Sequence, residues 1–460
     1  MQAGFLFDAN KCVGCHACAV ACAIENHLQP EMNWRQILTF NPAGIAGIPH
    51  FHLSMACNHC ERAVCMEQCP AQAIRKDAAT GAVLINGKQC IGCHFCSWVC
   101  PYDAPTFDHT ENVMTKCTFC SPRLQEGLKP ACVTVCPTDA LEFDYFEPPV
   151  GTPDFPGFPE SGIRPSIKIT ALRSNGTTAQ QFSQPYSKDI LSEFIGAKNN
   201  LPAKISLQKE WALVVFTLLV AILVGLFSAA FLGGVSLNPF IFAGGGAAGM
   251  ALSTVHLGKR HRAFRAVLNW RSSWLSREIF CFSLFIAGAT VFLLFKQFLW
   301  LGYISLGLGF TAAFCVDMVY KVTASVKKEA LHSSQILLSV LFFSAFFNHF
   351  FPGVVFLASL KLFLYLNRKR KDMPKESRSF SFVAVRLVSG LILPPTLLLI
   401  DDRAFFASAL ILMLIGECID RAEFYGELDI LTPVKHTSVK FKKLFRLTYS
   451  ILTITFFALA

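Results

Sequence analysis

Sixteen of the nineteen cysteines in this chain lie between positions 12 and 136, in four groups with short, repeated spacings. In every group two residues separate the first two cysteines and three separate the last two, and a proline follows three of the groups. This spacing is typical of thiolates that bind a [4Fe-4S] cluster, with the fourth cysteine reaching a neighbouring cluster. Four groups therefore predict four [4Fe-4S] clusters in two ferredoxin-like modules. The groups are Cys12, Cys15, Cys18 and Cys22; Cys57, Cys60, Cys65 and Cys69; Cys90, Cys93, Cys96 and Cys100; and Cys117, Cys120, Cys132 and Cys136.

Zinc binding and disulfide formation fit this cysteine pattern less well. Zinc accepts four cysteines, but its sites favour two separated pairs and leave the third cysteine of a C-x2-C-x2-C run unexplained. Disulfides require an oxidising compartment. The N-terminal sequence MQAGFLFDANKC lacks the basic and apolar regions of a secretory signal. We therefore interpret the sixteen cysteines as iron ligands.

The rest of the chain is mainly apolar. Overall, 53% of the 460 residues are hydrophobic and 16% are charged, and the mean hydropathy is +0.44. The long apolar runs begin only at Trp211, which indicates a polar head followed by a membrane-embedded tail. The net charge of +10 comes mostly from basic residues in short loops between apolar runs. Membrane topology explains that distribution better than a phosphate-binding face, so we expect no nucleic-acid partner.

The fold class predicted is an α+β ferredoxin-like head with two tandem dicluster modules, followed by an all-α polytopic membrane bundle of about eight helices. The expected domains are a cluster domain over residues 1–145, an extended Pro/Gly-rich arm and linker over 146–208, a membrane anchor over 209–428, and a basic segment with an apolar tail over 429–460. Whether the arm lies on a surface or is a free tether is left open by its composition. The spans expected are Trp211–Leu232, Pro239–Leu257, Ile279–Phe295, Phe298–Val319, Gln335–Phe347, Val354–Leu366, Phe380–Ile400 and Phe405–Ile419.

Four stretches of the head carry a family resemblance: CVGCHACAVAC, CNHCERAVCMEQCPAQAI, CIGCHFCSWVCPYDAP, and KCTFC with GLKPACVTVCPTDAL. In this order they resemble the four-cluster electron-transfer subunit of the dimethyl sulfoxide reductase family of molybdoenzymes. The resemblance implies a separate molybdopterin-containing catalytic subunit as partner and four complete [4Fe-4S] clusters. It also implies that the first cysteine group pairs with the fourth and the second with the third. The implied ligand sets are Cys12, Cys15, Cys18 and Cys136; Cys117, Cys120, Cys132 and Cys22; Cys57, Cys60, Cys65 and Cys100; and Cys90, Cys93, Cys96 and Cys69.

The tail resembles the membrane anchor subunit of the same reductases. HLGKRHRAF, which starts at His256, and GECIDRAEFYG, which starts at Gly416, carry this second resemblance. It implies a quinone site at His256 beside the cluster of Cys90, with menaquinone or ubiquinone as the diffusible partner. The chemistry of quinol oxidation supports a histidine at this site, because the reaction releases protons and a histidine near a helix end can accept one. We expect no haem, because the tail histidines are not placed to face one another. The chain is then a fusion of cluster subunit and anchor.

Ionisable residues inside apolar spans are expensive to bury and are therefore functional candidates. The candidates are Asp317, Arg386, Glu417, Asp420 and Arg421, of which Glu417 and Arg421 could neutralise each other at i, i+4. The loops after the second, fourth and sixth spans are basic, which predicts a bacterial or archaeal cytoplasmic membrane with the cluster domain on the cytoplasmic side. Export of the head with a partner that carries a twin-arginine signal is the open alternative.

Three functions stay open. The chain could feed electrons from quinol to a reductase, or it could reduce quinone in a cytoplasm-facing sulfite-oxidising complex. A component of a redox-driven ion pump is the alternative of another class, and it would require a continuous polar path that includes Asp317 and Arg386. No nucleophile motif or nucleotide loop is present in the sequence, so we expect no turnover of a terminal substrate by the chain alone.

Overall fold

A computed structural model describes residues 1–41, 50–149, 153–160, 162–173, 204–324, 331–372, 380–400, 403–428 and 430–437. The chain forms two compact units. Of the described residues, the first contains those up to 204 together with 430–437, and the second contains those from 205 to 428. We describe each unit separately, and call the first the head and the second the helical unit.

The head is built on a small sheet in the order β8-β1-β9. The first strand, β1 (Gln2–Asp8), pairs antiparallel with β8 (Leu141–Phe146) and parallel with β9 (Ile167–Thr170). Phenylalanine side chains of β1 face the core, where Phe5 stacks on Phe119 with ring centroids 4.5 Å apart. This sheet brings both ends of the cysteine-rich sequence together.

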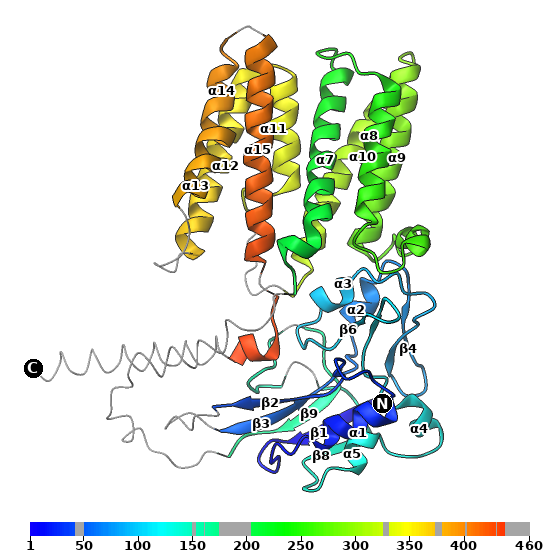
Figure 1. The fold of residues 1–460 in the computed structure, drawn as a ribbon. Helices are drawn as coiled ribbons and strands as arrows, with labels where there is room; N and C mark the ends of the chain where they lie inside the picture. The colour runs from blue at the N-terminus through cyan, green and yellow to red at the C-terminus, as the bar shows by residue number, and fades with distance from the viewer. Residues whose placement is uncertain are drawn as a thin grey trace, which may run out of the picture. The chain divides into compact units, whose positions relative to one another are not determined.

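Short hairpins and short helices complete the head (Figure 1). The hairpins are β2 (Gln36–Phe40) with β3 (Phe51–Met55), β4 (Ile74–Lys76) with β5 (Val83–Ile85), and β6 (Thr106–Asp108) with β7 (Val113–Thr115). The helices are α1 (Ala17–Glu25), α2 (Val64–Glu67), α3 (Phe95–Trp98), α4 (Ser121–Gln125) and α5 (Ala131–Thr134).

Part of the predicted arm belongs to the head. Strand β9 extends the sheet, and Phe155, Phe158 and Ile163 are buried in the core of the head. Residues 430–437 also belong to this unit, and Ile430 is buried there. Residues 174–203 of the predicted arm and 438–460 of the predicted tail lie outside the described residues. The predicted domain boundaries stay predictions, but the fold of the head continues beyond residue 145.

The helical unit consists of apolar helices that lie side by side, with their axes roughly parallel (Figure 1). Helix α7 contacts α8, α10, α11 and α15, and its Val220, Val224 and Phe227 are buried in the core. The described elements are α7 (Leu207–Phe231), α8 (Pro239–Ser253), η2 (Arg260–Val267), α9 (Trp274–Leu294), α10 (Leu299–Lys321), α11 (Ile336–Phe347), α12 (Phe351–Asp372), α13 (Phe380–Leu387), the π-helical turn η3 (Val388–Ile392), α14 (Leu393–Leu397) and α15 (Arg403–Glu427).

Local sequence explains where several of these helices begin. The Asn238 side chain accepts hydrogen bonds from the backbone N–H groups of Phe240 and Ile241, and Pro239 occupies the first turn of α8. Ser273 caps α9 in the same way, through the N–H of Ser276. Each cap satisfies backbone donors that would otherwise be unpaired at the start of the helix.

Among the described residues, four helices are long and apolar enough to cross a membrane, and they cover Leu207–Phe231, Trp274–Leu294, Leu299–Lys321 and Phe351–Arg370. Three further apolar stretches, Pro239–Ser253, Ile336–Phe347 and Val383–Leu397, are shorter. The second part of the chain is therefore a helical region with four candidate membrane spans. A bundle of about eight spans stays a prediction.

Candidate iron-sulfur centres

The four cysteine groups share one backbone turn. In each group the residue before the second cysteine has a positive φ, a conformation that glycine adopts without steric cost. These residues are Gly14, His59, Gly92 and Phe119, with φ of 69°, 42°, 68° and 60°. In three groups the N–H of that residue donates to the first cysteine sulfur, at 3.5 Å for Cys57, 3.4 Å for Cys90 and 3.4 Å for Cys117. Gly14 makes a backbone hydrogen bond to Cys12. The same turn therefore presents the first two sulfurs of every group.

Short helices position the later cysteines of each group. Helix α1 carries Cys18 and Cys22, whereas α2, α3 and α5 each carry the third cysteine of a group and end just before the fourth. One helical turn between the third and fourth sulfurs directs the fourth away from its own group. The repeated loop and helix thus give each group three local sulfurs and one distant sulfur.

The sulfurs converge in four sets, which we name sites I to IV. Two sets each line a small cavity in the head: site I is Cys12, Cys15, Cys18 and Cys136, and site IV is Cys90, Cys93, Cys96 and Cys69. In each of the other two sets, packing brings the cysteines close together: site II is Cys117, Cys120, Cys132 and Cys22, where α1 with Cys22 contacts α5 with Cys132, and site III is Cys57, Cys60, Cys65 and Cys100, where Cys57 and Cys100 pack in one cluster. The structure brings together the cysteines of each predicted set, while iron ligation by each set stays a prediction.

The chemistry of these sites fits an anionic metal cluster. Burial raises the pKa of the Cys22 and Cys65 thiols to about 12. Binding of iron must therefore release protons from buried thiols. Arg35 and Lys116, each 3% exposed, lie among the sulfurs and form no ion pair with a carboxylate in the described part of the head. Buried cations of this kind require nearby negative charge, which thiolate-ligated clusters supply.

Comparison with known proteins agrees with the geometry of the head. The family described as "4Fe-4S dicluster domain" matches residues 48–145. The B component of the anaerobic dimethyl sulfoxide reductase of Haemophilus influenzae is 40% identical over 151 residues, which cover 31% of this chain and 73% of that relative. This protein belongs to the family of that B component. It is therefore an iron-sulfur electron-transfer protein with a ferredoxin-like head.

Other relatives of the head have different substrates in their names. The thiosulfate reductase electron transfer subunit of Salmonella typhi is 38% identical over 141 residues, which cover 30% of this chain and 73% of that relative. The B component of the sulfite dehydrogenase of Allochromatium vinosum is 29% identical over 229 residues, which cover 42% of this chain and 95% of that relative. The helical unit of the present protein is consistent with fusion of a head of this family to a membrane-helix region.

In this member of the dimethyl sulfoxide reductase family, His256 lies in the turn after α8, next to the basic helix η2, and is half-buried. The neighbouring Leu257 is buried, and the Arg260 guanidinium donates to the carbonyl of Val255 at 3.0 Å. His256 is thus at a helix end, as the sequence indicated. A role in proton transfer stays a prediction.

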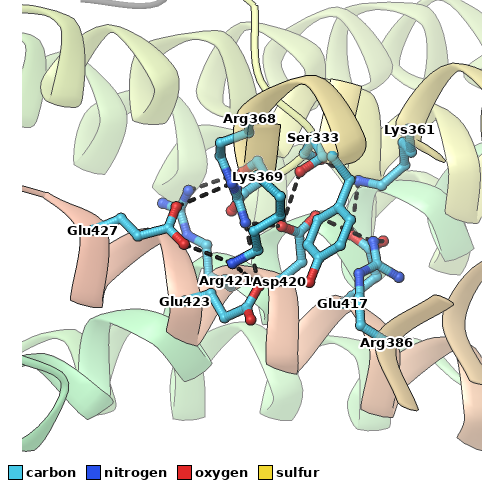
Figure 2. A network of polar contacts seen from close by, with 12 residues as sticks. Ser333, Lys361, Arg368, Lys369, Arg386, Glu417, Asp420, Arg421, Glu423 and Glu427 are labelled. Carbon is cyan, nitrogen blue, oxygen red and sulfur yellow. Dashed lines mark hydrogen bonds and ion pairs between the residues drawn. The ribbon is translucent and has the colours of Figure 1, made fainter. Parts of the chain in front are cut away.

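A buried charge network lies in the helical unit and joins α12, α13 and α15 (Figure 2). The Lys361 ammonium is 3.0 Å from Glu417, and the Arg386 guanidinium is 3.1 Å from both Glu417 and Asp420. Arg368 continues the network from Asp420, at 2.9 Å, toward the end of α15. All of these side chains are buried. Cations of α12 and α13 are therefore paired with carboxylates along α15.

Two sequence interpretations of these residues are wrong. Glu417 and Arg421 do not neutralise each other in the described helices, because Glu417 pairs with Lys361 and Arg386, whereas Arg421 donates to Thr217 and to the carbonyl of Ser334. Arg368 and Lys369 are not loop residues. They lie in α12, buried against carboxylates of α15, because α12 extends to Asp372 rather than ending near Leu366.

Sequence reasoning also did not single out the buried cations Lys361, Arg35 and Lys116. Lys361 interrupts an apolar run, and the cost of burying a charge inside a span would have marked it as a candidate. Arg35 and Lys116 had no such signal, because each lies among polar residues of the head without a periodic pattern around it. Their burial follows from tertiary packing and is visible only in the structure.

Asp317, another predicted candidate, has a local role in the structure. Its carboxylate accepts hydrogen bonds from the N–H groups of Ile336 and Leu337 at the start of α11, at 2.8 and 3.1 Å. Backbone donors at a helix start have no partner within the helix, so this carboxylate satisfies two of them. These contacts join the end of α10 to the beginning of α11.

Proposed function

We propose that this chain passes electrons between a quinone pool and a separate molybdopterin-containing catalytic subunit. The observation that carries the proposal is the convergence of four cysteine sets in a head whose chain continues into helices long enough to span a membrane. The relatives support the partner, because they are named as components of sulfur-compound reductases and a dehydrogenase. The chain itself would then turn over no terminal substrate.

Sites I to IV would each hold one [4Fe-4S] cluster, and such a cluster supplies one-electron transfer when bound. The chain contributes four sulfurs to each site. In the four motif turns it also contributes backbone hydrogen bonds to the first sulfur, which hold the sulfur in place and favour its charged form. Two tandem modules follow from the exchange of fourth ligands between the first and fourth groups and between the second and third.

The helical unit would anchor the head through about eight membrane-crossing segments, with the quinone site at His256. Menaquinone and ubiquinone both fit this role, because the chemistry requires only a proton acceptor near the quinol hydroxyl. The basic residues of η2, between α8 and α9, support a cytoplasmic location for that end of the helices. Arg368 and Lys369 give less support than a basic loop would, because they pair with buried carboxylates.

Copurification tests the partner. We expect a tagged chain, extracted from its native membrane, to carry with it a molybdenum-containing protein in about equal amount, because an electron-transfer subunit needs a catalytic subunit as donor or acceptor. Mass spectrometry and metal analysis measure this outcome. A preparation that contains full iron but no molybdenum would contradict the proposal. A twin-arginine signal on the partner would move the head to the other side of the membrane.

Replacement of His256 tests the quinone site. In the His256→Asn variant we expect the rate of cluster reduction by a quinol analogue to fall about 10²- to 10⁴-fold, the usual contribution of a positioned proton acceptor. Reduction of the same clusters by dithionite should not change. His261→Asn is the matched control, because His261 is exposed on η2 only a few residues away. An equal loss in both variants would exclude a specific role for His256.

The direction of electron flow has two candidates. The reductase direction follows the dimethyl sulfoxide and thiosulfate reductase relatives. The opposite direction, sulfite oxidation with quinone as acceptor, is supported by the sulfite dehydrogenase component that aligns over 95% of its length. The copurified complex separates the two, because only the second would reduce a quinone analogue when sulfite is added.

A redox-driven ion pump is the candidate of another class, and the charge network favours it in part. Its buried charges form a continuous chain of ion pairs from Lys361 to Glu427. This chain of ion pairs covers only one half of the helices, since residues 351–360 of α12 and 404–416 of α15 contain no ionisable side chain. Asp317 makes its hydrogen bonds to the start of α11 rather than to the network. A path across the whole unit would therefore need water or an opening of the apolar half.

A further inference from the structure

Two cations are buried in the head without a carboxylate partner among its described residues. The Arg35 guanidinium donates to the Ser54 hydroxyl at 2.8 Å and lies over the ring of Phe5, 4.5 Å from its centroid. The Lys116 ammonium donates to the carbonyls of Val83 and Cys117. These neutral contacts satisfy hydrogen bonds but provide no opposite charge, so the free-energy cost of burying each cation must be offset by another anion.

The positions of the two cations are related to the cysteine sites in an ordered way. Arg35 donates to the Ser54 hydroxyl, which is 3.5 Å from the Cys18 sulfur of site I, and it also hydrogen bonds to Cys132 of site II. Lys116 directly precedes Cys117 of site II, donates to its carbonyl at 3.1 Å, and hydrogen bonds to the side chain of Cys57 of site III. Arg35 therefore lies between sites I and II, and Lys116 lies between sites II and III. Site II faces both cations.

The remaining sites have a different environment. Lys204 interacts with Cys100 of site III, but its charge is compensated by Asp103, whose carboxylate is 2.7 Å from the ammonium. The principal electrostatic neighbours of Cys93 and Cys96 in site IV are other cysteines. Lys76 lies beside site III, where it donates to the carbonyl of Cys60 at 3.5 Å, and Glu61 is its carboxylate neighbour. Among the described residues, the two deeply buried cations without a carboxylate partner thus lie around sites I, II and III rather than around site IV.

Fixed charge of this kind acts on reduction potential. A cluster with four thiolate ligands becomes more negative when it accepts an electron, so a nearby cation stabilises the reduced form more than the oxidised form. The effect is larger in a protein interior than in water, because the effective dielectric constant is lower. Each cation should therefore raise the potentials of the two clusters between which it lies.

We propose that Arg35 and Lys116 are positioning charges that raise the reduction potentials of the clusters between which they lie, with both cations acting on the cluster of site II. This inference rests on the proposed cysteine sets. The two cations would then stabilise an electron on the cluster of site II and control how readily it leaves for site I or site III.

Redox titration of the intact, cluster-loaded chain, followed by electron paramagnetic resonance, tests the proposal. We expect Arg35→Gln to lower the potentials of the clusters in sites I and II and to leave those in sites III and IV unchanged. Lys116→Gln should lower the potentials in sites II and III only. The signals are assigned to sites with single cysteine variants, and iron content is measured for every preparation.

Charge-conserving variants separate an electrostatic role from a structural one. Arg35→Lys and Lys116→Arg should retain most of the wild-type potentials, whereas Lys88→Gln, which removes an exposed cation of the head, should change none of them. If a glutamine variant does not assemble, the methionine variant at the same position is titrated instead, and the same two potentials must fall. Unchanged potentials at full iron content, or an equal shift of all four signals, would overturn the inference. Fewer than four clusters in the wild type would instead overturn the proposed cysteine sets.

Discussion

Serine in place of Cys136 should remove or convert the cluster of site I and leave that of site II, although Cys136 belongs to the same cysteine group as the site II ligands Cys117, Cys120 and Cys132. The reason is geometric, because Cys136 lines the same cavity as Cys12, Cys15 and Cys18. Cys22→Ser should have the reverse effect, because Cys22 interacts with Cys120 and Cys132. Complete loss of one cluster would lower the iron content by about a quarter.

Iron analysis and electron paramagnetic resonance measure this exchange. The spectrum of Cys136→Ser should match that of Cys12→Ser and differ from that of Cys117→Ser. Cys418→Ser is the control, because Cys418 is an exposed cysteine on α15 outside all four sets. If Cys136→Ser and Cys117→Ser instead lose the same signal, each cysteine group binds its own cluster and the paired arrangement is wrong.

Removal of one partner from the charge network should strongly destabilise the helical unit. Glu417 accepts hydrogen bonds from Ser339, Lys361 and Arg386, so Glu417→Gln leaves two buried cations with less compensation. Breaking a buried ion pair typically costs about 3–5 kcal/mol. Lys361→Met should cost less, because Glu417 keeps Arg386 as a partner. Thermal and denaturant unfolding in detergent measure both effects.

The double variant Lys361→Met with Glu417→Gln completes a thermodynamic cycle. We expect it to be less destabilised than the sum of the two single variants, since it removes both members of the pair. Lys321→Met, which changes an exposed lysine at the end of α10, should have little effect. Additive costs would show that Lys361 and Glu417 act independently and would contradict the importance of their contact.

The same variants distinguish a structural network from an ion path. For a structural network, a folded Lys361→Met variant should carry electrons at the wild-type rate, and vesicles that contain it should show the same pH change per electron as the wild type. For an ion path, electron transfer would continue while the pH change in the vesicle interior disappears. A pH-sensitive dye in reconstituted vesicles measures the difference.

The cysteine sites were the part of the molecule most predictable from sequence, because their spacing is local and each motif contains its own turn and helix. The later helices were predictable as apolar runs, since hydropathy is also a local property. The pairing of Lys361 with Glu417 was not predictable, because 56 positions separate the two residues and only packing of α12 against α15 brings them together.

The end of α12 was also not predictable from the sequence, because it depends on contacts with residues that are distant in the chain. RKRK at positions 368–371 has the composition of a basic loop, and an apolar run ends just before it. Carboxylates on α15 stabilise a longer helix instead, because Glu423 and Glu427 compensate Arg368 and Lys369.

Arg386 likewise depends on residues that are distant in sequence. Its guanidinium lies where a Cβ on Gly390 or Gly416 would collide with it. Gly390 in η3 and Gly416 in α15 therefore leave room for the guanidinium. The residues next to Arg386 in the sequence do not predict this room, because Gly416 is distant in the chain.

The division of the chain has a mechanical consequence. The sequence leaves the head at residue 204, forms the helical unit, and returns to the head at Ile430, so the helical unit is an insertion with two covalent connections. A single cut at residue 204 would divide the chain into two fragments, and all sixteen cysteines of the four sites would lie on the first. Only the packing of residues 430–437 within the head would then keep the electron carrier attached to the anchor, because Thr432, Pro433 and Lys435 line a cavity with residues of the first fragment.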